Sequence, residues 1–427
     1  MIDLLATYVH DFDPVIFSIS EKIKLRWYGL SYVMGFAAAY LILLRLSRKK
    51  LWPIAELKVG DVVTYTAIFG VFLGGRIGYV LFYMLPSPGG LERILEDPIT
   101  IIAVWEGGMA SHGGILGIML FTLFYAWKKQ RTLWPAVGDG FAIVAPLGIF
   151  FGRMANFING ELYGTVTDEK NWWAVKFPKS LYESGYSDQL QKGLQQAAVN
   201  NDAAGEFLKD RIRLVGDYDG YDLSQQAFEQ EFLPIARENP DVMQALADHA
   251  PARHPSQLYE GILEGLLVFL ILYVIRLKFP KLRHGILTGI FFVAYALFRI
   301  LVENVREPDA EMVGEMTKGQ FLSIFMVAIG VSFIASAFIL IPRRFWTGIG
   351  GVGLGAVTFS FGGTSTLEFT GGFLALAGGL LTFSGFMLGQ PYWRFLPGSL
   401  VSNYSQEPGK SRKAFDIYRQ ISDKKAQ

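Results

Sequence analysis

The residues best suited to chemistry lie at positions 152–164, GRMANFINGELYG, directly after an apolar run that ends at Phe151. Their polar members are an arginine, two asparagines and a glutamate: Arg153, Asn156, Asn159 and Glu161. Charged groups at membrane depth cost several kcal/mol unless they pair or line a polar cavity, so this stretch indicates a functional site. The alternative is an interfacial cap whose arginine reaches lipid headgroups. The interleaved glycines, of which Gly164 is the last, indicate close backbone approach to a ligand or a neighbouring helix.

A second polar strip follows later in the chain. Tyr295, Arg299 and Glu303 are spaced by four residues, and Arg306 comes three residues further on. Such spacing predicts that all four side chains share one face of a helix. A buried ion pair between Arg299 and Glu303 is the structural alternative. However, a guanidinium fork beside a tyrosine and a glutamate also suits an anionic headgroup, because it matches phosphate oxygens.

Two further motifs place polar side chains at the ends of apolar runs. Residues 254–260, HPSQLYE, open one run, with Glu260 just inside it. Residues 112–114, HGG, open another, and the imidazole of His112 can exchange a proton near neutral pH. A lone interfacial histidine is more often a satisfied hydrogen-bonding group than a catalyst. Tyr28, in RWYGL, is explained as readily by an aromatic belt as by a substrate contact.

The composition indicates a membrane protein. Of the 427 residues, 51% are hydrophobic and only 18% charged, and the mean hydropathy is +0.31, so a soluble fold would expose too much apolar surface. The net charge of +1 gives no indication of a nucleic-acid partner. With no cysteine, the chain has no thiolate zinc site and no cysteine nucleophile, so any thiol must come from a substrate. We found no HExxH helix and no phosphate-binding glycine loop, so we expect neither a metal nor a cofactor.

The apolar runs predict an all-α polytopic membrane protein with about seven transmembrane helices. The runs cover roughly residues 27–46, 62–85, 113–127, 137–153, 258–275, 286–302 and 321–341. Clusters of lysine and arginine follow the first, third, fifth and seventh runs, which is the pattern of cytoplasmic loops. The N-terminus is therefore predicted to be extracytoplasmic and the C-terminus cytoplasmic.

These runs divide the chain into five predicted segments. They are a first membrane part at 1–164, an extracytoplasmic and largely helical insert at 165–252, a second membrane part at 253–344, a glycine-rich apolar extension at 345–402 and a polar cytoplasmic tail at 403–427. The extension could add one or two spans. Within the insert, residues 188–214 and 223–237 have helical patterns, and residues 1–26 are predicted to be an interfacial helix or loop.

Together these motifs resemble the bacterial prolipoprotein diacylglyceryl transferases. The family signature, GR, two residues and then NFxNxExxG, is met by residues 152–164, and the HGG, HPSQLYE and late arginine motifs follow the family's pattern. The resemblance covers roughly residues 20–165 and 252–342. Ala155 stands where the family commonly has glycine, and the insert and the extension exceed the usual family length.

The resemblance implies a reaction in the bacterial plasma (inner) membrane. The diacylglyceryl group of phosphatidylglycerol passes to the lipobox cysteine thiol of a prolipoprotein signal peptide, a thioether forms and glycerol-1-phosphate leaves. The implied partners are phosphatidylglycerol, the lipobox and membrane lipid. A thiol with a pKa near 8.5 needs a base as it attacks, for which His112 is the candidate, aided by Tyr295. Arg153 and Arg299 would stabilise the departing phosphate.

The resemblance also implies a substrate-binding group. In it, carboxylates and amides orient the arginines or the glycerol hydroxyls, and Tyr28 contacts lipid or peptide. The group consists of Arg153, Tyr28, Asn156, Asn159, Glu161, Gly164, Glu260, Glu303 and Arg306. Two other classes of protein would also gather charges in a helix bundle. A transporter of an anionic solute or lipid commonly has repeated halves, and we found no repeat of the arginine strip in the first four spans. A lipid-binding scaffold would not explain four separate polar motifs.

Overall fold

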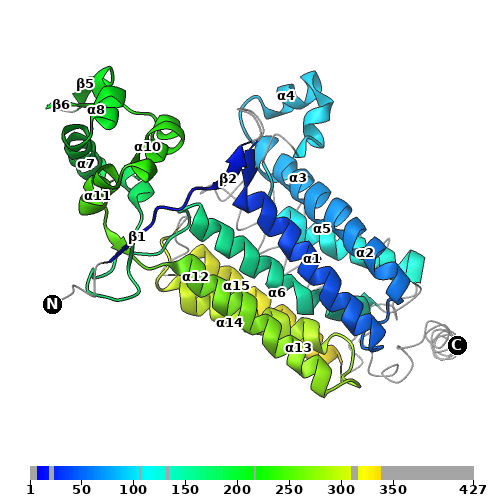
Figure 1. Cartoon of the computed structure of the whole chain (residues 1–427). Helices are drawn as coiled ribbons and strands as arrows, with labels where there is room; N and C mark the ends of the chain where they lie inside the picture. Colours follow the sequence, from blue (N-terminus) through cyan, green and yellow to red (C-terminus); the bar gives the residue numbers. More distant parts are fainter. Residues whose placement is uncertain are drawn as a thin grey trace, which may run out of the picture. The chain divides into compact units, whose positions relative to one another are not determined.

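Apolar helices dominate the chain in the computed structural model, which describes residues 7–18, 24–104, 108–130, 134–183, 185–215, 218–308 and 316–337 (Figure 1). Five helical stretches are long and apolar enough to cross a membrane: Trp27–Arg48, Glu56–Met84, Trp134–Ile158, Ser256–Lys278 and Ile286–Glu303. Shorter apolar helices, Gly113–Phe124 and Gly319–Val331, occupy the other two predicted positions. The polytopic all-α class is therefore confirmed. The glycine-rich extension and the polar tail lie outside the described residues.

The chain divides into two compact units, which are described separately. The first unit consists of Met1–Met34, Ile149–Ile262 and Leu301–Asp309, and the second of Gly35–Gly148, Leu263–Ile300 and Ala310–Gln427. Several long helices begin in one unit and end in the other. The site residues are accordingly divided between the units as well.

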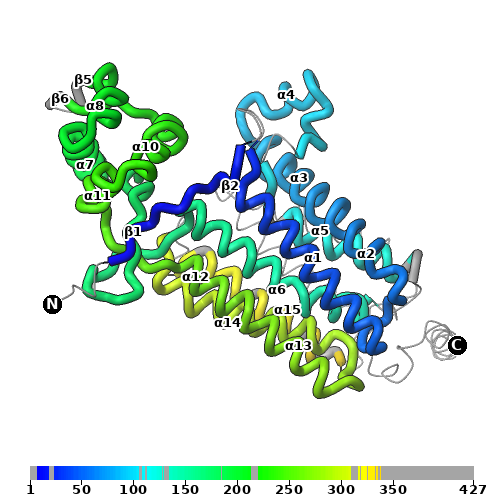
Figure 2. Tube along the Cα trace, in the orientation of Figure 1, coloured from blue at the N-terminus to red at the C-terminus, as the bar shows by residue number. Residues whose placement is uncertain are grey.

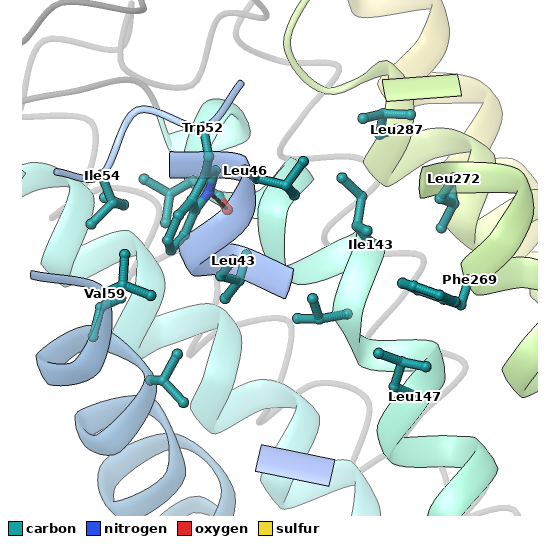
Figure 3. Close-up of a cluster of buried hydrophobic side chains, with 14 of the residues drawn as sticks. Leu43, Leu46, Trp52, Ile54, Val59, Ile143, Leu147, Phe269, Leu272 and Leu287 are labelled. Atoms are coloured by element: carbon teal, nitrogen blue, oxygen red, sulfur yellow. Dashed lines mark hydrogen bonds between the residues drawn. The ribbon is translucent and has the colours of Figure 1, made fainter. Parts of the chain in front are cut away.

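The second unit is a bundle of apolar helices, whose course along the chain is also visible in Figure 2. Its elements before α6 are α1 (Trp27–Arg48), η1 (Glu56–Lys58), α2 (Val59–Tyr65), η2 (Thr66–Phe72), α3 (Leu73–Tyr79), η3 (Val80–Met84), α4 (Gly90–Glu96), η4 (Pro98–Ile101), α5 (Ser111–Phe124) and η6 (Tyr125–Gln130). These are followed by α6 (Trp134–Ile158), η9 (Gly261–Leu267), α13 (Val268–Lys278), α14 (Ile286–Glu303) and α15 (Lys318–Ser336). The buried core joins α1, α2, α6, α13 and α14 through residues such as Leu43, Val59, Ile143, Leu272 and Leu287 (Figure 3).

A buried carboxylate fixes the start of α14. Asp139, in α6, accepts hydrogen bonds from the backbone N–H groups of Gly285 and Thr288, both at 2.9 Å, and from the Thr288 hydroxyl at 2.8 Å. Arg276, in α13, lies 3.3 Å from the same carboxylate. The first N–H groups of a helix have no partner within it, so a carboxylate from a neighbouring helix satisfies them and interacts favourably with the helix dipole. Three spans are joined at this point by one acidic side chain.

The helix that begins with the HGG motif packs against α3 with almost no side chain between the two backbones. A Cβ atom added to Gly78 would lie 2.5 Å from the Cα atom of Gly113, and one added to Gly74 would lie 2.7 Å from the Gly113 carbonyl oxygen. Small residues let helices in membranes approach this closely. The backbone that carries His112 is therefore held by the neighbouring glycines of α3.

The first unit contains a small sheet and a helical insert. The sheet has the order β1 (Tyr8–Val9), β4 (Val175–Lys176), β7 (Ala252–Arg253), with β1 parallel and β7 antiparallel to β4. A second pair, β2 (Val15–Ser18) and β3 (Lys24–Arg26), precedes α1. The interfacial helix or loop predicted for residues 1–26 is therefore wrong where short strands form. The pairing of β1 depends on β4, a partner distant in sequence, whereas β2 and β3 pair with each other.

The insert packs its helices around a core of its own, which includes Leu194, Phe228, Phe232 and Leu246. Its elements are η7 (Pro178–Tyr182), α7 (Ser187–Asn200), α8 (Asp202–Lys209), β5 (Ile212–Val215), β6 (Tyr218–Tyr221), α9 (Gln225–Ala227), η8 (Phe228–Phe232), α10 (Leu233–Glu238) and α11 (Pro240–His249). The helical pattern expected over 188–214 breaks after α8, because β5 pairs with β6 as a hairpin. The short helix α12 (Ser256–Glu260) then begins the next span.

The glycine crossing can be tested by matched alanine substitutions. Gly78→Ala forces two backbones apart, and overpacking of this kind costs about 1–3 kcal/mol. Gly148→Ala, in α6, has no atom within 4 Å of the new Cβ and should be neutral or slightly stabilising. We expect thermal unfolding in detergent to show a lower midpoint for Gly78→Ala alone. Equal midpoints for the two variants would contradict the close crossing.

Candidate functional site

One carboxylate in the first unit is shared by two arginines. Glu260, at the end of α12, lies with Oε2 2.7 Å from Nη2 of Arg153 and with Oε1 2.6 Å from Nη1 of Arg306. The Glu260 side chain is 0% exposed, that of Arg306 is 4% exposed and that of Arg153 is 20% exposed. Two guanidinium groups and one carboxylate leave a net charge of +1. Because Arg153 is the more accessible arginine, it is the group that an incoming anion would meet.

The amides of the GRMANFINGELYG stretch extend this cluster. Arg153 donates from Nη1 to Oδ1 of Asn156 at 3.4 Å, and Asn156 donates from Nδ2 to Oε1 of Glu161 at 2.8 Å. Asn159 reaches the same Glu161 oxygen at 3.4 Å. The four polar residues of this stretch therefore form one network. A chain of hydrogen bonds in a poorly solvated place fixes the direction of each side chain and strengthens its neighbours.

The HPSQLYE motif holds the backbone of the loop that follows Ile158. Gln257 donates to the carbonyl oxygen of Glu161 at 2.7 Å, and Ser256 donates to that of Leu162 at 3.0 Å. Leu162 has a φ of 58°, a left-handed conformation that costs a non-glycine residue about 1–3 kcal/mol. Buried side chains of the HPSQLYE motif thus hold the loop after Ile158 in a strained conformation. This explains why the two motifs carry polar residues at buried positions.

The glycines of the site differ in what surrounds them. At Gly164 the predicted close approach is confirmed: an added Cβ would overlap the Val305 carbonyl oxygen and lie 2.8 Å from the His254 Cβ. Gly160 has a φ of 60° and faces the ring of His10, a buried residue whose pKa is lowered to about 4, chiefly by desolvation. Gly152 has no atom within 4 Å of an added Cβ, so the close approach of a neighbouring helix was a wrong prediction there.

Arg306 does not lie on the helix with the other members of the late polar strip. Helix α14 ends at Glu303, and Arg306 forms an isolated antiparallel bridge with Gly164. The expectation that all four side chains share one helix face is therefore wrong for Arg306, since its backbone pairs with the first motif. This pairing directs the guanidinium to Glu260. Glu303 itself is buried at the end of α14.

Arg253 is a buried residue of the site that the sequence analysis missed. It donates to the Gly164 carbonyl oxygen at 3.2 Å, to Glu307 at 3.0 Å and to Glu183 of the insert at 2.8 Å. The guanidinium carbon also lies 4.8 Å from the ring centre of Tyr163. Burial, together with the hydrogen bond to Glu183, raises the pKa of Tyr163 above its usual range. The sequence offered one signal for Arg253: it directly precedes the HPSQLYE motif.

In the second unit, Arg299 faces another buried carboxylate that the sequence analysis missed. Its Nη1 atom lies 3.9 Å from Oε1 of Glu264, and both side chains are largely buried. Glu264 lies in η9, a π-helical segment, and π-helical turns in α-helices are frequent at functional sites. An acidic residue four positions after Glu260 in an apolar run was the signal. The ring of Tyr295 packs on Phe291, with centroids 6.0 Å apart.

The remaining predicted site residues lie at helix starts. Tyr28 is in the first turn of α1, half-buried, with its ring 5.7 Å from that of Tyr32. Helix α5 begins at Ser111, as the HGG motif predicted. The side chain of His112 lies outside the described residues. Among the residues that the structure describes, no group of three or more His, Cys, Asp or Glu could hold a metal ion.

The helices and the arginine cluster define a class: a multi-pass membrane protein with a buried cluster of arginines and carboxylates at the ends of its spans. Comparison with known sequences gives the family. A sequence profile described as prolipoprotein diacylglyceryl transferase matches residues 14–336. The match runs through the insert at 165–252, which the motifs alone did not cover.

Relatives named phosphatidylglycerol--prolipoprotein diacylglyceryl transferase agree with the profile. The one from Bdellovibrio bacteriovorus is 37% identical over 338 residues, covering 76% of this chain and 92% of the relative. Those from Serratia proteamaculans and Azospirillum brasilense are 35% and 36% identical, cover 78% of this chain and are themselves covered to 96% and 97%. The chain belongs to the prolipoprotein diacylglyceryl transferase family.

The shared carboxylate predicts a large effect on stability. Glu260→Ala leaves the buried Arg306 without its 2.6 Å partner, and removing one member of a buried ion pair costs about 3–5 kcal/mol. We expect a strongly lowered thermal midpoint in detergent. Glu56→Ala, which removes the partner of Arg48 in an exposed pair, is the control and should change the midpoint little. Similar midpoints for both variants would contradict the central place of Glu260.

Proposed function

We propose that this chain transfers the diacylglyceryl group of phosphatidylglycerol to the lipobox cysteine thiol of prolipoproteins. The substrate sulfur bonds to the glyceryl carbon that carries the phosphate, the carbon–oxygen bond breaks and glycerol-1-phosphate leaves. The observation that carries the proposal is the partly exposed guanidinium group of Arg153, held in place by the buried carboxylate of Glu260. Family membership and the names of the relatives support the same reaction.

The charge change during the reaction explains the need for fixed guanidinium groups. The phosphodiester carries one negative charge, and its phosphate gains a second as the carbon–oxygen bond breaks. A preorganised cation therefore binds the transition state more strongly than the substrate, which is the condition for catalysis. We assign this role to Arg153 and Arg299, with Tyr295 beside Arg299 on α14. Glu260 and Glu264 keep the two guanidinium groups oriented.

The other assignments come from the hydrogen-bond network around Arg153 and from the sequence motifs. We assign Asn156, Asn159 and Glu161 to orienting Arg153 and the glycerol hydroxyls, and Tyr28 to lipid or peptide contact. Arg306, buried behind Glu260, acts through that carboxylate, and Gly164 and Glu303 maintain the shape of the site. His112 takes the thiol proton. The last assignment depends on the sequence motif and on the position of the start of α5.

The proposed location is the bacterial inner membrane, with the site on the extracytoplasmic side. Arg45 and Arg48 end α1, and Arg276 and Lys278 end α13, which supports a cytoplasmic position for these two helix ends. The N-terminus is then extracytoplasmic and the C-terminus cytoplasmic. A signal peptide crossing the same membrane would present its lipobox at the level of the site.

The function is tested with purified protein, phosphatidylglycerol and a lipobox peptide with or without its cysteine. We expect release of glycerol-1-phosphate only with the cysteine peptide. Arg153→Ala and Arg299→Ala should each lower the rate by at least about 10²-fold, because each removes a charge-stabilising donor. Arg48→Ala, in an exposed pair on the same chain, is the matched control. Solute uptake into vesicles without glycerol phosphate release would instead indicate a transporter.

The same assay distinguishes the base from the positioning carboxylates. His112→Gln should lower the rate by about 10²-fold or more while leaving the KM for phosphatidylglycerol near its wild-type value. Glu264→Gln should lower kcat by roughly 10²-fold, because small displacements of Arg299 misplace its charge, and Glu264→Asp should restore part of it. Full activity of Glu264→Gln would rule out a positioning role for that carboxylate.

A further inference from the structure

Two adjacent tryptophans project from the loop between the site and β4. Trp172 is 82% exposed and Trp173 is 36% exposed, and their rings meet edge to face with centroids 5.5 Å apart. Large aromatic rings are rarely this exposed without a function, because burying one is worth several kcal/mol. The same segment also exposes Leu162 and Val166.

The indole N–H groups indicate what kind of surface covers these rings. Two tryptophans of the helix bundle use theirs within the protein: Trp52 donates to the Val137 carbonyl oxygen at 3.2 Å and Trp134 to the Thr122 hydroxyl at 3.1 Å. Within the described ranges, Trp172 and Trp173 have no such acceptor. An apolar ring with an available donor suits a boundary where apolar material meets hydrogen-bond acceptors.

The loop holds the rings in place through its own hydrogen bonds. Asn171 donates from its side chain to the Thr167 hydroxyl at 2.9 Å, and its carbonyl oxygen accepts from the Ala174 N–H at 2.9 Å. Glu169 pairs with Lys176 of β4 at 3.0 Å, and its carbonyl oxygen accepts from the Thr7 hydroxyl at 2.9 Å. The exposure of the rings is therefore built into an ordered turn.

We propose that Trp172 and Trp173 insert into the lipid headgroup region of the leaflet at which α6 ends, and so set the depth of the arginine cluster. Helix α6 is one of the apolar spans and ends at Ile158, so this loop leaves the membrane boundary directly. Tryptophan is enriched at that boundary, where ester carbonyl and phosphate oxygens accept from the indole. Two perpendicular rings form a wedge, whereas the apolar helix of a signal peptide binds a groove.

The inference extends the proposed function, because the tryptophan loop is continuous with the site. Between the two lie Gly164, bridged to Arg306, and Val166, bridged to Arg253. Arg253 in turn holds the Gly164 carbonyl oxygen at 3.2 Å. A fixed depth for the tryptophans therefore fixes the depth of Arg153, which must meet the phosphate of a lipid in the same leaflet.

The chain contains no cysteine, so a single introduced cysteine can carry a spin label without background. Trp172→Cys is labelled in vesicles of phosphatidylglycerol and phosphatidylethanolamine, and its relaxation by oxygen is compared with that by a water-soluble nickel complex. Val199→Cys is the control, because Val199 is an apolar side chain of the insert that is 86% exposed. We expect the label at 172 to favour oxygen and the label at 199 to favour nickel.

Two results of this measurement would overturn the proposal. The label at 172 could be as accessible to nickel as the label at 199, which would place the loop in water. It could also become shielded only when the lipobox peptide is added, or only as protein concentration rises, which would assign the surface to the peptide or to a second copy. None of these readings depends on catalysis, so a failure of the proposed transfer reaction would be recognised separately.

The coupling to the site has its own readout. The double variant Trp172→Ala, Trp173→Ala should raise the KM for phosphatidylglycerol in vesicles about fivefold or more, with kcat little changed and with no effect in detergent micelles. Phenylalanine at both positions should restore most of the affinity, because the apolar ring remains. An unchanged KM in vesicles would overturn the link between loop depth and substrate capture.

Discussion

The attraction between one buried carboxylate and two guanidinium groups is the constraint on which the first unit depends. Glu260 is fully buried, and an isolated charge there would be strongly disfavoured. Arg153 and Arg306 each supply a short contact to it. Of the two arginines, Arg153 remains partly exposed, which is the property that the proposed role in phosphate binding requires.

The loop shapes around the cluster follow from this requirement. Arg306 reaches Glu260 because its backbone pairs with that of Gly164. This pairing requires glycine at position 164, because a Cβ atom there would overlap the Val305 carbonyl oxygen. Gln257 and Ser256 hold the neighbouring strained loop, and Arg253 joins it to the insert. These buried side chains therefore satisfy backbone carbonyl oxygens and carboxylates of the loops around the cluster, as a low-dielectric interior favours.

In the second unit, a buried carboxylate and a close backbone contact fix where helices begin. Asp139 accepts from the first N–H groups of α14 and pairs with Arg276, at the end of that helix remote from Arg299 in sequence. The glycine crossing between α3 and α5 gives the HGG motif a fixed backbone. Helix starts are thus fixed by a carboxylate or by close backbone contact, and Arg299 lies along a helix whose start is already fixed.

Much of this architecture is determined by composition and local pattern. Apolar runs long enough for a bilayer can only be helices, so the spans were predictable, and polar residues at their ends marked Arg153, Glu260 and Arg299 without any contact information. The same reasoning marked Asn156, Asn159 and Glu161 as candidate site residues, but not the hydrogen bonds that join them. Contacts between distant segments were decided only by the tertiary structure. Arg306 leaves its helix to pair with Gly164, Arg253 joins three segments, Glu264 faces Arg299, and a short strand near the N-terminus pairs with β4 where an interfacial helix or loop was expected. The physical reason is that helix formation depends on neighbours a few residues apart, whereas a buried charge or an unpaired backbone group is satisfied by whichever segment the fold brings to it.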